Sequence, residues 1–110
     1  MTDDNNNNDD DIFEAPAHPG TWIKSILDAN KLSIQKASKQ LSVDRQTLSK
    51  LVHCGSGVSV DMAIRLEIWV GSSSKCRAAI NWLNAQARYD LWMAEQKIDY
   101  KNIQPLNYLG

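Results

Sequence analysis

Two short amphipathic segments that follow each other almost without a break constrain this chain more than any other feature of its sequence. Residues 33–41 and 44–53 both space their apolar residues as one face of a helix, and only two residues lie between them. Ser33 and Asp44 are residue types that cap helix N-termini. Because a connection this short makes two helices cross steeply, the sequence predicts a helix-turn-helix unit.

The second of these segments combines an inward apolar face with an outward polar face. Five apolar residues are expected to pack the unit together: Ala37, Leu41, Val43, Leu48 and Leu51. Arg and Lys side chains donate to guanine O6 and N7, Gln pairs with adenine, and Thr contacts the thymine methyl group. Polar side chains and amides at the start of the first helix can bind phosphate. We therefore predict a DNA-binding site that consists of Ser33, Gln35, Arg45, Gln46, Thr47, Ser49 and Lys50.

Three residues of the unit leave a second interpretation open. Ser38 stands where such units usually have Ala, and Ser42 stands where they often have Gly, which adopts a left-handed conformation at less cost. Asp44 places a carboxylate close to where the DNA backbone would lie. The polar face can therefore also belong to an ordinary solvated helix, in a protein-interaction module whose helix-turn-helix no longer binds DNA.

Helical spacing continues on both sides of this unit. Thr21 is a candidate N-cap for the preceding helix, and Ser59 is a candidate N-cap for a helix over 60–70. A long helix is expected over 75–96, and 102–110 is expected to be extended. The sequence contains no strand-like alternation that is longer than a few residues. The predicted class is all-α: a five-helix bundle containing a helix-turn-helix, with a disordered acidic N-terminal tail.

The net charge of −1 conceals an acidic arm on a basic body. Residues 1–14 hold six of the 13 acidic residues and no Lys or Arg, whereas the rest of the chain holds all 12 basic residues. We expect a disordered acidic tail over 1–17, since its first part has no apolar residue after Met1 to bury. A helix-turn-helix DNA-binding and dimerisation domain is expected over 18–110. The tail can cover the basic DNA face, approach a basic partner, or serve only as a solubilising tail.

Several classes of protein are excluded by what the sequence lacks. No stretch approaches the ~18 apolar residues of a membrane span. The acidic N-terminus is the opposite of a signal peptide, so we expect a cytoplasmic protein without membrane contact. His18 and His53 do not stand at ligand spacing from Cys54 and Cys76, so no metal site is expected, and the cysteines are expected to be buried. No cofactor or catalytic motif is present, so no cofactor and no enzymatic activity are expected.

The long last helix carries two apolar stripes that point in different directions. The aliphatic stripe consists of Ile80, Leu83, Ala87, Leu91 and Ala94, and the aromatic stripe consists of Trp82, Ala85, Tyr89 and Trp92. The two lie about 100° apart around the helix. One stripe can face the core of the chain, and exposed aromatic patches usually mark interfaces. We predict that Trp82, Tyr89 and Trp92 form a dimer interface; the alternative is that neighbouring helices cover both stripes.

Four motifs occur in an order and approximate spacing that are typical of one family. They are His18-Pro19-Gly20, then Leu32-Ser33 followed by 41–49 (LSVDRQTLS), then 59–66 (SVDMAIRL), and finally 82–86 (WLNAQ) with 89–92 (YDLW). In this pattern, over about residues 18–106, the chain resembles the HigA-type antitoxins of the phage-repressor-like (Xre) helix-turn-helix group. The link before Trp82 is longer than in that family, and the acidic tail lies outside the family pattern.

The resemblance implies a bacterial or phage protein that binds pseudo-palindromic operator DNA as a homodimer and represses its own operon. It also implies a protein partner, a HigB-type toxin, which is a ribosome-dependent mRNA endonuclease that the antitoxin neutralises. No toxin-contacting residue is carried over, because the mode of toxin binding varies within the family. A phage-repressor-like regulator without a toxin stays open as an alternative, and a neighbouring gene for a small basic toxin would separate the two.

Overall fold

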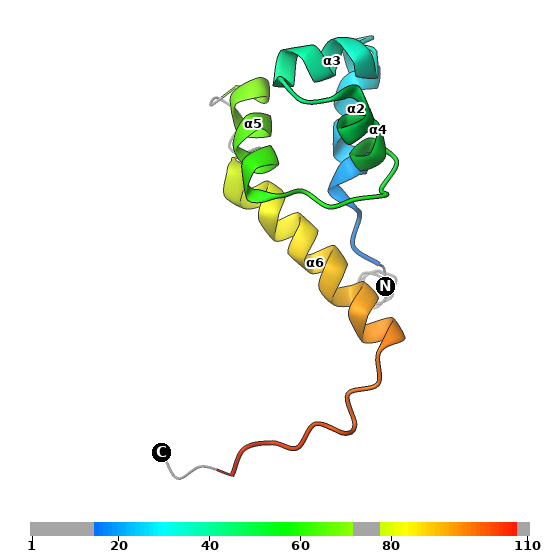
Figure 1. Cartoon of the computed structure of the whole chain (residues 1–110), viewed down its shortest axis with the longest axis vertical. Coiled ribbons are helices and arrows are strands. Elements are labelled where there is room, and N and C mark those ends of the chain that lie inside the picture. The colour runs from blue at the N-terminus through cyan, green and yellow to red at the C-terminus, as the bar shows by residue number, and fades with distance from the viewer. Residues whose placement is uncertain (1–14, 72–77, 108–110) are drawn as a thin grey trace, which may run out of the picture.

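The computed structural model describes residues 15–71 and 78–107, and these residues form five α-helices and no strand (Figure 1). The helices are α2 (Pro19–Ala29), α3 (Ile34–Leu41), α4 (Arg45–Val52), α5 (Val60–Val70) and α6 (Ala79–Lys97). This confirms the all-α class and the helix-turn-helix, which α3 and α4 form. Most of the predicted acidic tail lies outside the described residues, and residues 15–17 have no regular structure.

One hydrophobic core joins all five helices. α2 packs against α4 and α6, while α5 packs against α3 and, most extensively, against α6. The central cluster of this core consists of Ile23, Leu27, Ala37, Leu41, Leu48, Leu51, Val52, Val58, Met62, Ala63, Leu66 and Trp82. After α6 the chain leaves the domain as an extended segment (Figure 1), and its apolar side chains, such as Ile103 and Leu106, are exposed.

Side-chain caps begin three of the helices, and one of them differs from the prediction. Ser33 and Ser59 accept hydrogen bonds from the backbone N–H groups of Lys36 and Met62, as expected for N-caps. The prediction that Thr21 caps the first helix is wrong. α2 begins earlier, at Pro19, because a proline at the first helical position has the required φ and lacks only an N–H that would be unpaired.

His18, Pro19 and Gly20 join α2 to two other helices. The Nδ1 atom of His18 accepts a hydrogen bond from the N–H of Gly20 at 2.8 Å, and its buried ring packs edge-on against Tyr89 of α6 with centroids 4.8 Å apart. A Cβ atom at Gly20 would clash with the carbonyl oxygen of Leu51, so the start of α2 touches the end of α4. This short motif therefore fixes α4 and α6 relative to α2.

The two stripes of α6 face the opposite way from the prediction. Trp82 is fully buried, with its ring 5.6 Å from that of Trp22, and Tyr89 and Trp92 are half-buried. Ile80 and Leu91 of the aliphatic stripe are 60% and 61% exposed. The prediction that Trp82 contributes to a dimer interface is therefore wrong. Large aromatic rings bury the most apolar surface, and α2 supplies matching aromatic partners, so the aromatic stripe takes the core side.

Three smaller predictions have different outcomes. α6 begins at Ala79 instead of residue 75. Residues 75–77 lie outside the described residues, and so does the predicted burial of Cys76. The expectation that Cys54 is buried is wrong, since it is exposed in the turn that ends α4. Within residues 15–71 and 78–107, no helix is long and apolar enough to cross a membrane.

Candidate nucleic-acid interface

The turn between α3 and α4 is tight and closed by backbone hydrogen bonds. Ser42 adopts the left-handed conformation (φ 58°, ψ 45°), and the N–H of Val43 donates to the carbonyl of Ser38 at 3.0 Å. A non-glycine residue in this conformation costs about 1–2 kcal/mol. The hydroxyl of the buried Ser38 donates to the carbonyl of Gln35 at 2.7 Å, so it is satisfied. Both serines are thus compatible with a regular helix-turn-helix.

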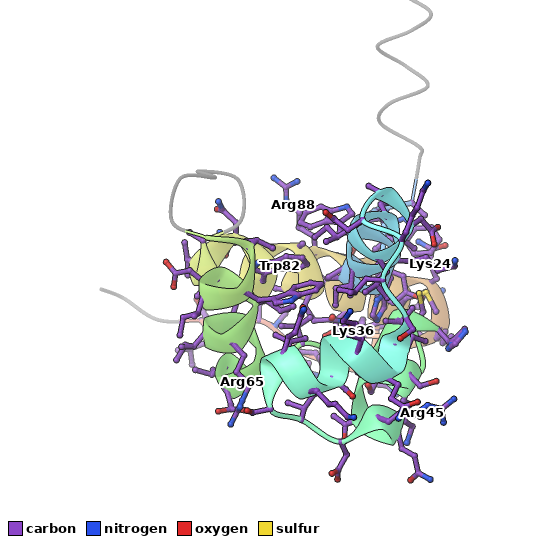
Figure 2. The ribbon with its side chains drawn as sticks, turned by 90° about the horizontal axis from the view of Figure 1, so that it is seen from above. Lys24, Lys36, Arg45, Arg65, Trp82 and Arg88 are labelled. Carbon is purple, nitrogen blue, oxygen red and sulfur yellow. The ribbon has the colours of Figure 1, made fainter. Side chains whose placement is uncertain are left out.

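The outward face of α4 carries most of the side chains predicted to bind DNA. Leu48, Leu51 and Val52 are buried, and this orients the opposite face to solvent. On α4 the exposed residues are Arg45, Gln46, Thr47 and Lys50, and Ser49 is half-buried. Ser33, the N-cap of α3, and Gln35 in its first turn are exposed as well. Figure 2 shows Arg45 pointing away from the domain at the end where α3 and α4 lie. The structure therefore brings the predicted residues onto two adjacent helices.

The side chains of this face are available to an external partner. Within the part of the chain that the structure describes, Arg45, Gln46 and Lys50 form no side-chain hydrogen bond or ion pair. The segment 33–53 contains four basic residues and a single acidic one, Asp44. His53 is held at the end of α4, where its Nδ1 donates to the carbonyl of Ser49 at 2.7 Å. The face is thus basic and polar, and no side chain of residues 15–71 or 78–107 pairs with Arg45, Gln46 or Lys50.

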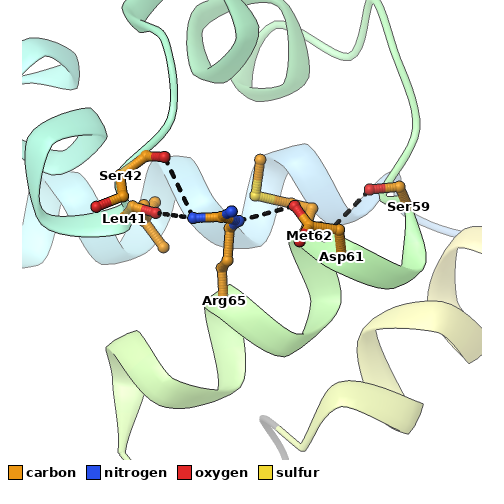
Figure 3. Close-up of polar contacts among 6 residues, drawn as sticks. All are labelled: Leu41, Ser42, Ser59, Asp61, Met62 and Arg65. Atoms are coloured by element: carbon orange, nitrogen blue, oxygen red, sulfur yellow. Dashed lines mark hydrogen bonds and ion pairs between the residues drawn. The ribbon is translucent and has the colours of Figure 1, made fainter.

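A contact from α5 that the sequence pattern does not predict supports the turn. The Nη1 atom of Arg65 donates to the carbonyl oxygens of Leu41 at 2.9 Å and Ser42 at 3.2 Å (Figure 3). Its Nε atom donates to Asp61 at 2.7 Å. The sequence signals only the ion pair within α5, because Asp61 and Arg65 are four residues apart on one helix face, and it does not signal the bonds to the turn.

A second tether, also missed from the sequence, connects the loop after α4 to α6. The buried side chain of Gln86 accepts a hydrogen bond from the N–H of Val58 at 3.0 Å and donates to Asp90 at 2.9 Å. Gly57 lies directly against this side chain, where a Cβ would approach within 3.1 Å. The turn before α4 is therefore held from α5, and the loop after α4 is held from α6.

The chain is similar to known proteins in both sequence and fold. No protein-family model matches the chain. It is 35% identical over 92 residues to virulence-associated protein I of Dichelobacter nodosus, which covers 82% of this chain and 81% of that protein. An addiction module antidote protein of a HigA family from Coxiella burnetii superposes with a TM-score of 0.69, at 26% identity over 84% of this chain and all of that chain. The Pseudomonas aeruginosa antitoxin HigA, solved with the higBA promoter, also superposes with a TM-score of 0.69, at 29% identity over 83% and 98% of the two chains.

The chain belongs to the HigA family of helix-turn-helix antitoxins.

This membership confirms the resemblance that the four motifs indicated, and contacts in the structure show what three of the motifs do. The motif of His18, Pro19 and Gly20 packs α2 onto α4 and α6, and the motif around Trp82 supplies the core ring and the Gln86 tether. The motif that contains Arg65 supports the turn. Because HigA antitoxins and their related regulators are non-enzymatic, the prediction that the chain is not an enzyme is confirmed.

Proposed function

We propose that this HigA-family chain binds its operator as a homodimer, represses its own operon and neutralises a HigB-type mRNA-cleaving toxin in the cytoplasm. The observation that carries the proposal is the exposed polar face of α4, a helix whose preceding turn is held from α5 and whose following loop is held from α6. It is strengthened by the similarity to a Pseudomonas aeruginosa antitoxin that was solved with a promoter.

Arg45, Gln46 and Lys50 are the residues proposed to read bases. All three are exposed on α4, and their donor groups match the acceptors of guanine and adenine in the major groove. Ser33, Gln35, Thr47 and Ser49 are proposed to contact phosphates or a thymine methyl group. Ser49 is half-buried and lies 3.5 Å from the His53 ring, so it has less freedom than the others. Base reading and backbone positioning are thus divided among neighbouring side chains.

A dimer is needed because one recognition helix reads only a few base pairs. Two copies on a pseudo-palindrome place their recognition helices about 34–36 Å apart, which is one turn of DNA. With Trp82 in the core, the better candidates for the interface are the exposed apolar side chains of α5 and α6, among them Ile64, Ile68, Ile80 and Leu91. We propose that these side chains gather into one patch in the dimer, since exposed apolar patches usually mark a contact with another protein.

Competition binding to DNA tests the repressor function. The full chain should bind the DNA upstream of its own gene at least ~10³-fold more tightly than random DNA at the same salt concentration. Equal affinity for both DNAs would contradict the proposal and favour a protein-interaction module. Co-expression with the product of the neighbouring gene then separates an antitoxin from a regulator without a toxin, because only an antitoxin forms a stable complex that restores growth.

A further inference from the structure

The two ends of α4 are held in different ways. Its C-terminal half is fixed by the burial of Leu51 and Val52 and by the close approach of Gly20 to the carbonyl of Leu51. Its first turn, before the buried Leu48, has no side-chain cap, because the side chain of Asp44 forms no capping hydrogen bond. The caps of α2, α3 and α5, in contrast, each accept a backbone N–H. The position of the start of α4 therefore depends on the turn that precedes it.

Arg65 holds that turn from outside. The carbonyls of Leu41 and Ser42 lie at the C-terminal end of α3, where carbonyl groups lack partners within the helix and carry partial negative charge. The guanidinium of Arg65 donates to both oxygens through one nitrogen, and Asp61 fixes the orientation of its plane through Nε (Figure 3). A fixed cation thus satisfies two carbonyl groups of the turn.

We propose that Arg65 is a positioning residue for base reading, which sets the angle at which α4 presents Arg45 and Gln46. This inference rests on the proposed DNA-binding function. Arg45 follows Ser42 by only three residues, so a small rotation of the turn displaces the first reading side chains directly. Recognition tolerates displacements of only about 0.5 Å, which makes a support of this kind necessary.

The exposure of the pair indicates that its role is not mainly to stabilise the fold. The Asp61 side chain is 71% exposed and the Arg65 side chain is 36% exposed. Exposed ion pairs contribute little to the free energy of unfolding. Loss of Arg65 is therefore expected to change discrimination between DNA sequences more than it changes stability.

Two substitutions of Arg65 test the proposal in the full chain. Arg65→Gln is too short to reach both carbonyls and should weaken operator binding about tenfold, which is the loss expected when one base contact is displaced. Its affinity for random DNA should change no more than that of a matched control. Arg65→Lys keeps a cation near the carbonyls but loses the Nε bond to Asp61, so it should recover part of the operator affinity.

The chain offers a matched control in the exposed ion pair between Lys24 and Asp28 of α2. This pair has the same four-residue spacing, with 3.3 Å between its charged atoms, and it is remote from the turn in sequence and contacts. Lys24→Gln removes one positive charge just as Arg65→Gln does. It should change the affinities for operator and random DNA by equal factors.

Three outcomes decide the question. The proposal would be overturned if Arg65→Gln bound the operator as tightly as the unmodified chain does. It would also be overturned if Arg65→Gln lost the same factor of affinity on operator and on random DNA, and this loss exceeded that of Lys24→Gln. Hydrogen exchange in the free protein gives a second measurement, in which the hydrogen-bonded amides of Val43 and Leu48 should exchange faster in both Arg65 variants than in Lys24→Gln. Unchanged exchange there would also overturn it. If the unmodified chain itself does not prefer its operator, the proposed function fails, while hydrogen exchange still tests the support of α4.

Discussion

α4 and α6 both turn one face to the core, but they leave different chemistry outside. α4 exposes Arg45, Gln46 and Lys50, which water solvates well. α6 exposes Ile80 and Leu91, and its neighbour α5 exposes Ile68. A polar face is stable in water without a partner, whereas exposed apolar side chains gain free energy when a partner removes them from water. This difference is the basis for the proposal that DNA binds at the face of α4 and a second copy of the chain at α5 and α6.

Replacing the core ring of α6 should have the largest effect. Trp82→Ala is expected to lower the free energy of unfolding by about 3–5 kcal/mol, because it removes a fully buried ring packed on Trp22. Leu91→Ala, on the exposed face of the same helix, should change the unfolding of the monomer by less than about 0.5 kcal/mol. Denaturant unfolding at low protein concentration measures both. A stable Trp82→Ala variant that changes only its oligomeric state would place that ring in an interface after all.

Adding charge to the apolar surface should break the dimer without unfolding the chain. Ile68 is 74% exposed, so Ile68→Asp adds no buried charge in a monomer, but it puts an unpaired carboxylate into the proposed interface. The dimer dissociation constant should rise by about tenfold or more, which corresponds to at least ~1.4 kcal/mol. Sedimentation measures this, with Ser25→Asp on α2 as the control. If both variants dimerise alike, the partner copy binds elsewhere.

Truncating the reading side chains should affect only operator binding. Arg45→Ala and Gln46→Ala are each expected to cost about 1–3 kcal/mol on the operator and to relax specificity at one base pair per half-site. Binding isotherms on operator and random DNA at one salt concentration provide the comparison. Equal losses on both DNAs would reduce these residues to phosphate contacts.

Relieving the left-handed turn should have the smallest effect. Ser42→Gly is expected to raise the free energy of unfolding by about 0.5–1 kcal/mol, because glycine adopts this conformation without strain but has more freedom in the unfolded chain. Thermal unfolding measures the change, and Ser25→Gly in the regular helix α2 should shift stability in the opposite direction. A destabilised Ser42→Gly variant would mean that the serine side chain has a role in the turn.

Local sequence signals predicted the α3–α4 unit well, because its determinants are local. The caps at Ser33 and Ser59, the short turn and the alternation of Leu48 with polar neighbours all lie within a few residues of what they determine. The orientation of α6 was not predictable in this way. Both of its stripes are apolar, and the choice between them depends on Trp22 and His18, which lie about 60 residues earlier in the chain.

The supports of the reading unit were missed for a related reason. Arg65 and Gln86 are polar residues on helix faces, and nothing in their own segments indicates that they hydrogen-bond to distant backbone groups. His18 and Gly20 were identified only as a family marker. They join three helices through contacts with the carbonyl of Leu51 and the ring of Tyr89, which are distant in the sequence. Tertiary contacts of single side chains leave little periodic signal in a sequence.

The assignment of two surfaces to two partners can be tested in one titration. Operator DNA added to the dimer at a fixed concentration should shift the backbone NMR signals of residues 33–50, and the signals of 64–68 and 91 should stay in place. Dilution of the free protein should have the opposite effect, shifting the signals of the α5–α6 surface and leaving those of α4 unchanged. Operator-induced shifts concentrated on α5 and α6, with α4 unaffected, would contradict the assignment of DNA to the helix-turn-helix face.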